Sequence, residues 1–319
     1  MRDEVRFLSE IVSIDSPTGS TNEVLEGLAG WCVKMGLKAE DVNGALVINP
    51  GGEDLLLLGH MDTVPGNIPV RIDDKELWGR GSVDAKGPLC AAICALSRIE
   101  ERSGICLVAV PDEEGSSGTA RMIAEEWKPR PVVILEPSGL NGITIQYNGR
   151  LLIELTSTAE RSHSGSDEMF ASEKVFASYD LIRRSCSPRI LRMEGGIEKA
   201  EIILDIRYED EPVIPDTEGI EVKIIERIGM CRTDKRSPLA RSFLRSMRSL
   251  GMDPVFKRKT GTCDMNIIGN AWDTPVIAYG PGDGRLDHTN EERINIDEYL
   301  RSIDVLEGAI RDQIPSMDP

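Results

Sequence analysis

Two ionisable side chains end a long apolar run in the first fifth of the chain. The segment LLLLGHMD carries four leucines, at positions 55 to 58, and then places His60 and Asp62 two positions apart. Such a run is typical of a strand buried in the core of an α/β protein. Burying a histidine or a carboxylate without a partner costs free energy, so the pair indicates that other polar groups meet it at the end of the strand.

Further ionisable side chains follow the other apolar runs. Glu113 and Glu114 come after ICLVAVP, Glu136 follows VVIL, and His288 stands in the loop after VIAYG. Asp84 lies in a glycine-rich loop, GRGSVDAKG, just ahead of a predicted helix. Because open α/β sheets gather their sites at the carboxyl ends of the strands, we expect these side chains to converge. Clustered carboxylates repel one another, so the set predicts bound cations, and a pair of divalent ions is the simplest solution.

The strands that position these groups alternate with helices along the first half of the chain. Helices are predicted at about 5–12, 24–35, 87–102 and 117–127, and Ser20 and Glu23 have the spacing of a capping box ahead of the second. Continuous apolar strands between helices predict a largely parallel sheet covered on both faces. After Gly142 the strands alternate apolar and polar residues, as expected for a sheet with one solvated face.

These patterns predict an α/β protein of two domains. Residues 1–146 and 251–319 are expected to form a three-layer catalytic domain, and residues 147–250 a smaller inserted α+β domain with a helix at about 169–184. A hydrophobic content of 40% in 319 residues is enough for two cores.

Composition excludes several classes of partner. The 37 lysines and arginines stand against 54 aspartates and glutamates, and the resulting charge of −17 repels nucleic acids and anionic membranes. We find neither a signal-peptide pattern nor an apolar segment of membrane-spanning length. Seven cysteines without a Cys-x-x-Cys spacing predict reduced, packed thiols. We therefore expect a cytoplasmic protein without nucleic-acid or membrane partners.

The motifs, taken in order, resemble one family over nearly the whole chain. LLGHMDTVPG, LWGRGSVDAKGPL, VPDEEGSSG, LEPSG and YGPGDGRLDHTNEE resemble the M20 metallopeptidases and amidohydrolases, which include acetylornithine deacetylase and succinyl-diaminopimelate desuccinylase. Within this family, TGTCDMN and GPGDGRLDHTNEE are most similar to the hydrolases that release lysine or ornithine from the amino-group carrier protein LysW. The resemblance implies a zinc-exopeptidase-like catalytic domain with an inserted lid domain.

The resemblance assigns metal-binding roles to five side chains. It implies that His60, Asp84 and Glu136 bind one divalent ion and that Asp84, Glu114 and His288 bind the other, with Asp84 bridging the two. Zinc is the expected ion, and cobalt and manganese are alternatives that accept the same ligands.

Three further residues receive catalytic roles by the same resemblance. Glu113 falls on the family's general base, and Asp62 falls on the acid beside the first histidine. Positions i and i+2 of an extended segment point the same way, so Asp62 can orient the ring of His60. His163 corresponds to a lid histidine that reaches the developing oxyanion, often from the other subunit of a dimer; a polar loop histidine without a role is the alternative.

The expected contacts to the substrate rest on two arginines. Arg207 resembles a lid arginine that meets a substrate carboxylate, although an outward-facing strand arginine is the alternative. Arg285 and the glycines of YGPGDGRLD could present donors to an α-carboxylate. Relatives usually show an asparagine ahead of a proline before the lid arginine, whereas this chain has RMEGGIEKAE, which leaves the lid contacts open. The resemblance also implies a cis peptide bond between Asp84 and Ala85.

The implied reaction is hydrolysis of an acyl amide that releases lysine or ornithine, in lysine or arginine biosynthesis. The substrate is then an amino-group carrier protein, and a basic rim would have to offset the negative charge if that carrier is acidic. Alternatives are a deacylase of acylated amino acids, such as N-acetylornithine or N-acetyl-lysine, and a dipeptidase. A non-catalytic binding module on the same fold is a remote alternative, because every expected ligand and the base are present. A lid histidine acting across subunits would require a homodimer through the lid domain.

Overall fold

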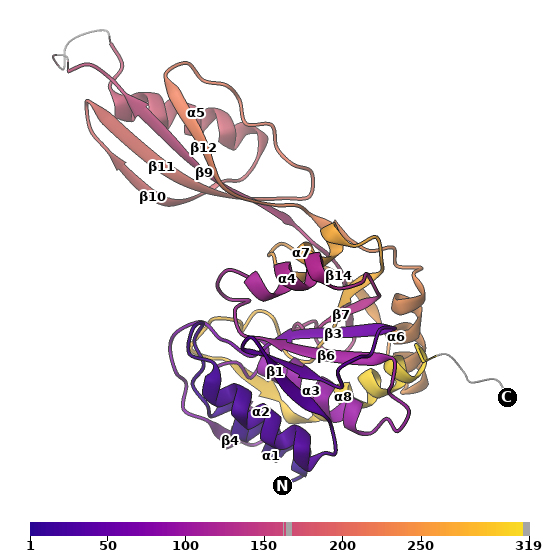
Figure 1. The fold of residues 1–319 in the computed structure, drawn as a ribbon. Helices are drawn as coiled ribbons and strands as arrows, with labels where there is room; N and C mark the ends of the chain where they lie inside the picture. Colours follow the sequence, from indigo (N-terminus) through magenta and orange to yellow (C-terminus); the bar gives the residue numbers. More distant parts are fainter. Residues whose placement is uncertain (162, 164–167, 315–319) are drawn as a thin grey trace. The chain divides into compact units, whose positions relative to one another are not determined.

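The computed structural model describes residues 1–161, 163 and 168–314 of the 319-residue chain. The chain folds into two compact units (Figure 1): unit 1 comprises residues 1–146, 232–258 and 267 onward, and unit 2 comprises 147–231 and 259–266. The sequence predicted an insertion that ends at 250. Residues 232–250 belong to unit 1 instead, because helix α6 (Pro238–Ser249) packs against helix α8 (Ile296–Arg311) and strand β15 (Val276–Ala278) of that unit, and residues 259–266 belong to unit 2.

Unit 1 is built on a mixed sheet with the strand order β1-β2-β6-β3-β7-β15-β8-β13, and β14 pairs with β8. The four central strands β6, β3, β7 and β15 are parallel, whereas β2 and β8 join them antiparallel. The predicted parallel sheet is thus limited to the centre. Besides β15, the strands are β1 (Ala39–Val42), β2 (Ala45–Ile48), β3 (Leu55–His60), β6 (Ile105–Val110), β7 (Val132–Ile134), β8 (Gly142–Tyr147), β13 (Cys231–Arg232) and β14 (Val255–Lys259).

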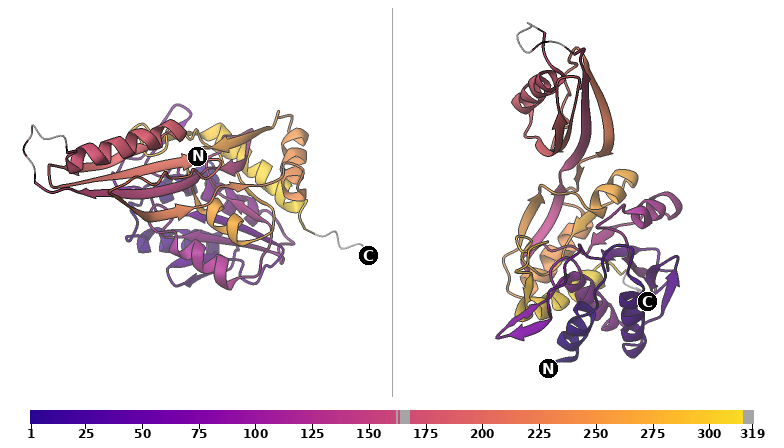
Figure 2. Two further views of the ribbon diagram at one scale, coloured as in Figure 1. Left: turned by 90° about the horizontal axis from the view of Figure 1, so that it is seen from above. Right: turned by 90° about the vertical axis from the view of Figure 1, so that its left-hand side faces the viewer.

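Helices cover both sides of this sheet. Figure 1 and the right-hand view of Figure 2 place α4 on one side and α1 and α2 on the other. Helix α3 packs against α1 and α8, and it is buried from Lys86 to Leu96, as expected for a helix that is apolar on all sides. The remaining helices of unit 1 are α1 (Asp3–Val12), α2 (Asn22–Lys34), α3 (Lys86–Ser97), α4 (Gly118–Glu126) and α7 (Asp264–Ala271), whose first residues belong to unit 2.

The capping box predicted for α2 is wrong. The helix begins after Thr21, which makes no side-chain capping hydrogen bond, so Ser20 lies outside the cap position. Side-chain caps do occur on two other helices: Ser237 accepts a hydrogen bond from the backbone N–H of Ala240 in α6, and Asn295 does the same for α8.

A second, three-stranded sheet in unit 1 joins the loop that carries Asp84 to the loop that carries His288. Strand β5 (Glu76–Trp78) pairs antiparallel with β4 (Arg71–Asp73) on one side and with β16 (Arg293–Asn295) on the other. The loop that carries Asp84 leaves from the end of β5, and the loop that carries His288 enters β16. The pairing therefore brings these two segments together although about 200 residues separate them in the chain.

Unit 2 is a four-stranded antiparallel sheet with the order β10-β11-β9-β12, and helix α5 packs against β9, β11 and β12 (Figure 2). Its elements are β9 (Gly149–Thr158), α5 (Ala171–Ser185), β10 (Arg189–Gly195), β11 (Lys199–Tyr208) and β12 (Ile220–Ile228). Strands β9 and β11 alternate buried and exposed residues, as predicted. Strand β10 was not predicted, because all seven of its residues are exposed and carry no burial pattern.

The apolar runs that predicted strands are the buried centre of unit 1. Every residue of β2, β3 and β6 is buried, and the four leucines of β3 are at most 1% exposed. This close-packed core fixes the position of each strand end relative to the neighbouring strands. Among the described residues, no helix has the length and apolar character needed to cross a membrane.

Candidate metal centre

The parallel strands end at one level of the sheet. In the register of the sheet, His60 pairs with Val110, Leu58 pairs with Ile134, and Ile134 pairs with Ala278. The loops that follow β3, β6, β7 and β15 therefore start side by side, and they carry the polar residues that the sequence placed at strand ends.

Asp84 lies between the two histidines of this edge. Its Oδ1 is 3.3 Å from His60 Nε2, and its Oδ2 is 3.1 Å from His288 Nε2. Glu136 Oε1 lies 3.6 Å from the same nitrogen of His60, and Glu114 Oε1 lies 2.9 Å from that of His288. Each oxygen of one carboxylate thus faces a separate histidine–glutamate pair, an arrangement that suits a bridge between two ions.

The donor set fits divalent ions. Potential ligand atoms of His60, Asp84 and Glu114 lie within 4.8 Å of one another, and so do those of His60, Glu113 and Glu136. Imidazole nitrogens mixed with carboxylate oxygens suit zinc and its neighbours in the first transition row. The peptide bond between Asp84 and Ala85 is cis, which confirms that prediction.

Electrostatics at the centre favour positive charge. Hydrogen bonds to Asp84 and Glu114 raise the pKa of His288 to about 10. Burial by itself would lower the pKa of His60, but hydrogen bonds to Asp62 and Asp84 outweigh burial and raise it well above its usual range. Burial likewise would raise the pKa of Asp84, and the two histidines reverse this and lower it. In the metal-free protein, protons on the histidines therefore supply the charge that the carboxylates require.

His288 forms the solvent-facing side of the centre. Its side chain is 51% exposed, whereas that of His60 is 1% exposed. Its backbone has φ of 60°, in the left-handed region that non-glycine residues rarely adopt and that is frequent at functional sites. A substrate could therefore approach from the His288 side, while His60 is fixed in the core.

Asp62 has more partners than the sequence predicted. The ring of His60 hydrogen-bonds through Nδ1 to the backbone carbonyl of Asp62 at 2.9 Å and lies 3.4 Å from the carboxylate. The carboxylate itself accepts hydrogen bonds from the backbone N–H groups of Glu113 and Glu114, both at 3.2 Å, and from the hydroxyl of Thr18 at 2.6 Å. Asp62 therefore anchors the turn that carries the expected base as well as contacting the histidine.

Of the other predicted site residues, two belong to unit 2 and one is bound to an acid of its own loop. Arg285 is 89% exposed and binds Asp283 of its own loop through Nε and Nη2. Arg207 belongs to β11 of unit 2, where it donates to the hydroxyl of Thr262 at 2.9 Å. His163 is exposed and lies between β9 and α5 of the same unit.

Three buried charged residues around the centre were not predicted. Arg80, Lys86 and Glu292 are at most 5% exposed. Lys86 donates to the carbonyl of Ile14 at 2.6 Å, and burial lowers its pKa to about 8. Each belongs to a motif quoted above, but the sequence held no signal that distinguished these residues from solvated charges beside them.

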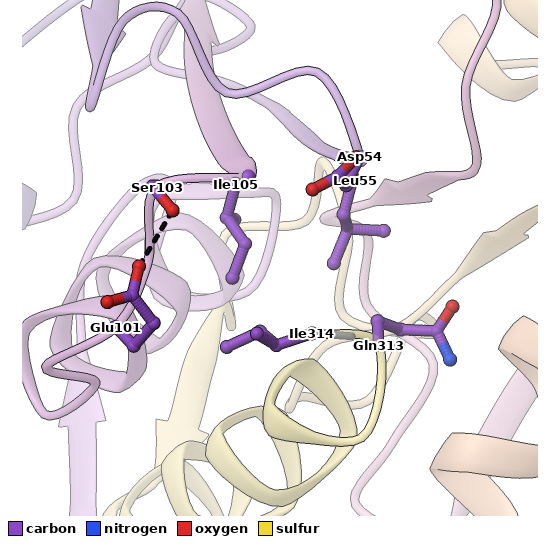
Figure 3. A pocket seen from close by; sticks show the side chains of 8 residues that line it. Asp54, Leu55, Glu101, Ser103, Ile105, Gln313 and Ile314 are labelled. Atoms are coloured by element: carbon purple, nitrogen blue, oxygen red, sulfur yellow. Dashed lines mark hydrogen bonds between the residues drawn. The ribbon is translucent and has the colours of Figure 1, made fainter. Parts of the chain in front are cut away.

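A separate cavity of about 210 Å³ lies at the amino-terminal ends of the central strands β3 and β6 (Figure 3). It is lined by Leu55 and Ile105, the first residues of β3 and β6, and by Ile314 beyond α8, and their apolar side chains converge on it. Glu101 and Ser103 hydrogen-bond to each other at its side. Since the ligand-bearing loops follow the other ends of these strands, this cavity is not part of the centre.

Comparison with known proteins gives one family. Residues 56–312 match the model of peptidase family M20/M25/M40. A protein of Pyrococcus furiosus, named provisionally as a LysW-lysine/LysW-ornithine hydrolase, is 40% identical over 322 residues that cover 97% of this chain and 96% of that protein. The LysW-lysine hydrolase of Deinococcus radiodurans is 33% identical, with 95% of each chain covered.

Solved structures share the fold at low identity. The aminopeptidase PepT of Bacillus cereus matches with a TM-score of 0.81 and 18% identity, over 97% of this chain and 98% of that one. A dinuclear metal binding peptidase of the M20 family from Bacillus subtilis matches with a TM-score of 0.75 and 11% identity, over 98% and 97% of the two chains.

Proposed function

This chain belongs to peptidase family M20/M25/M40, and we propose that it is a dinuclear-metal amidohydrolase that releases lysine or ornithine from an amino-group carrier protein. The position of the Asp84 carboxylate is the observation that supports this class of reaction. One of its oxygens faces His60, which lies beside Glu136, and the other faces His288, which lies beside Glu114. The similarity to LysW-linked lysine and ornithine hydrolases along the full length supports the choice of substrate.

In this proposal the five ligands hold two divalent ions, with zinc as the expected metal. When bound, such ions polarise an amide carbonyl and lower the pKa of a water molecule. The chain's own contribution is the placement of the ligands by the strand ends and of the base by the turn after β6. The five ligand side chains need no large conformational change to assemble, since each already lies within 3.6 Å of a neighbouring ligand.

Glu113 is the proposed general base. It precedes Glu114, its carboxylate lies within 4.8 Å of ligand atoms of His60 and Glu136, and its backbone N–H is fixed by Asp62. A carboxylate in this place can accept a proton from the attacking water and then donate it to the leaving amine. Because its backbone is held in place, the Glu113 carboxylate can occupy only a limited region, which favours proton transfer to and from the same position in both steps.

The residues of unit 2 are proposed to bind the substrate. His163 would meet the developing oxyanion, and Arg207 would meet a carboxylate. Arg285 would supply a further donor from unit 1, which requires exchange of its present partner Asp283. Substitution of each arginine by glutamine should raise KM more than it lowers kcat if these contacts form before the reaction.

A substrate panel tests the function. We expect kcat/KM for carrier-linked lysine to exceed that for free N-acetyl-lysine, N-acetylornithine and a dipeptide by about 100-fold, because contacts far from the amide contribute binding energy to the reaction. Glu113→Gln enzyme with both ions bound is the matched control for contaminating hydrolases. Equal or faster turnover of a free acyl amino acid would favour the deacylase alternative. An enzyme with two ions bound and no turnover of any of these amides would refute the proposed function.

We also propose a homodimer through unit 2. The edge strand β10 exposes Leu191 (56%) and Met193 (46%), and Phe176 of α5 (53%) lies with Met193 along one cavity. Exposed apolar side chains on an edge strand favour pairing with another chain. Light scattering of the purified protein and of Leu191→Arg tests this: a wild-type monomer contradicts it. We further propose a cytoplasmic location, because none of the seven cysteines, all of them described, forms a disulfide bond.

A further inference from the structure

Glu292 is a buried acid near the metal centre, and both of its carboxylate oxygens accept hydrogen bonds. Its Oε1 accepts hydrogen bonds from the backbone N–H groups of Val83 at 3.0 Å and Asp84 at 3.1 Å. Its Oε2 accepts one from Nη1 of Arg80 at 2.8 Å. The residue is fully buried and Arg80 is 5% exposed, so water cannot replace these contacts.

From this geometry we propose that Glu292, together with Arg80, is a positioning residue that holds the Asp84 loop in the conformation that binds both metal ions. The inference rests on the proposed function, since it concerns the metal centre of that enzyme. Glu292 is not expected to touch metal or substrate. It would act through the backbone of Asp84, whose carboxylate is the one group shared by both halves of the centre.

The first argument is the choice of a charged residue at this buried position. Removing a carboxylate from water costs several kcal/mol unless charge pairing and hydrogen bonds compensate it. Here two N–H groups donate to one oxygen and a guanidinium donates to the other, so both oxygens of a carboxylate are paired, whereas the NH₂ group of an amide would face a donor. A residue needed for packing alone would be satisfied by an apolar side chain of similar volume.

The second argument is the number of ligand-bearing segments that the pair joins. Arg80 donates through Nε to the carbonyl of Gly66 at 2.9 Å, in the segment that follows His60 and Asp62. The backbone of Glu292, four residues after His288, accepts a hydrogen bond from Gly79 N–H at 3.3 Å where β5 and β16 meet. Three segments that supply ligands are therefore tied together by one buried ion pair.

The third argument is the sensitivity of the centre to the position of Asp84. Its two oxygens lie 3.3 and 3.1 Å from different histidines, so a shift of its backbone toward one histidine would lengthen the contact with the other. Groups that orient metal ligands in this way typically change metal affinity by about 10- to 100-fold when they are substituted.

Glu292→Gln is the decisive substitution. Glutamine keeps one oxygen for the two N–H groups but directs its NH₂ group at the guanidinium of Arg80, donor against donor. Glu291→Gln is the matched control, because Glu291 is the adjacent acid, its side chain is 70% exposed, and its nearest cation is Arg293 at 3.8 Å. The same chemical change is thus made at neighbouring positions with and without the buried contacts.

Zinc affinity of the full-length protein, measured by competition with a chelator, is the main readout. We expect Glu292→Gln to bind zinc about 10- to 100-fold more weakly and Glu291→Gln to bind it as the wild type does. We also expect the visible absorption bands of the cobalt(II) form to shift in Glu292→Gln and to stay unchanged in Glu291→Gln. Thermal unfolding of the metal-free proteins is recorded in parallel.

The outcomes separate positioning from structural support. If Glu292→Gln lowers thermal stability but keeps wild-type zinc affinity and cobalt spectrum, the proposal is overturned. If that variant does not fold, Arg80→Lys decides, because the lysine ammonium lacks the two fixed, separate nitrogens through which Arg80 binds Glu292 and Gly66. Weaker zinc binding in Arg80→Lys supports the proposal, and wild-type affinity overturns it. If the wild type itself binds no divalent ions, the proposed function fails first, which is a distinct result.

Discussion

Replacing Asp62 by asparagine should damage both the stability of unit 1 and its affinity for metal. The carboxylate of Asp62 is fully buried and is surrounded by donors: the hydroxyl of Thr18, the N–H groups of Glu113 and Glu114, and the ring of His60. An amide of the same shape has one acceptor oxygen and one NH₂ group, so in either orientation it faces at least one backbone donor with another donor.

The magnitude follows from the hydrogen bonds that the amide cannot accept. If the NH₂ group replaces Oδ1, the hydrogen bond from Glu113 N–H is broken; if it replaces Oδ2, that from Glu114 N–H is broken, while the hydroxyl of Thr18 can rotate to accept. A hydrogen bond to a charged group contributes about 1.5–3 kcal/mol, and the retained bonds lose their charge assistance. We expect the free energy of unfolding to fall by about 2–4 kcal/mol and zinc affinity by about 10- to 100-fold.

Urea unfolding of the metal-free protein at pH 7 and chelator competition measure these two quantities. The control is Asp73→Asn, the same change at an exposed position of β4. Burial would raise the pKa of Asp62, but its hydrogen bonds outweigh burial and lower it, so its stabilising contribution is present above about pH 4 and is lost as the pH falls through the folded pKa. A change in unfolding free energy below about 0.5 kcal/mol together with unchanged zinc affinity would refute the reasoning.

Three further predictions address the base, the histidines and the packing below the centre. Glu113→Gln should keep both ions and lower kcat by about 10²- to 10⁴-fold, and a loss of less than tenfold would contradict its role as base. Because the pKa of His288 is raised to about 10, the ion that this residue binds should displace about one proton, and the affinity for that ion should tighten about tenfold per pH unit between pH 7 and 9. The pKa of His60 is also raised, so the affinity for the other ion should change with pH in the same direction. The raised pKa of His288 stabilises the metal-free fold fully below about pH 6.5, and this contribution is lost as the pH rises through about 10; a pH-independent zinc affinity would show neutral histidines. Gly280→Ala should lower the free energy of unfolding by about 1–3 kcal/mol, because its Cβ would lie 2.6 Å from a proline side chain of α3, whereas Gly30→Ala in open space on α2 should raise it by about 0.5–1 kcal/mol; equal effects in urea unfolding would contradict both.

Local patterns determined most of the secondary structure that bears the centre. The four leucines before His60 and the run before Glu113 predict buried strands because continuous apolar runs suit a sheet covered on both faces. Edge strands and helix ends were harder to predict. Strand β10 is exposed throughout and so carries no periodic signal, and the Ser20–Glu23 spacing suggested a cap that the helix does not use. Whether residues 232–250 belong to unit 1 or unit 2 depends on which unit α6 packs against, and the amphipathic pattern of the helix does not specify this.

The amino-acid sequence thus shows which residue types follow the buried strands, and the family resemblance predicts which five of them bind metal. The tertiary structure was needed to show which of the neighbouring acids are buried and which groups bind them. Glu291 and Glu292 are adjacent and chemically identical, yet one is exposed and the other is buried against Arg80 and the backbone of Asp84. Likewise, Asp62 meets the turn at Glu113 and the hydroxyl of Thr18 through contacts that span 51 and 44 residues. The physical reason is that burial and hydrogen-bond partners arise from segments distant in the chain, whereas sequence patterns report on neighbours one or two turns away.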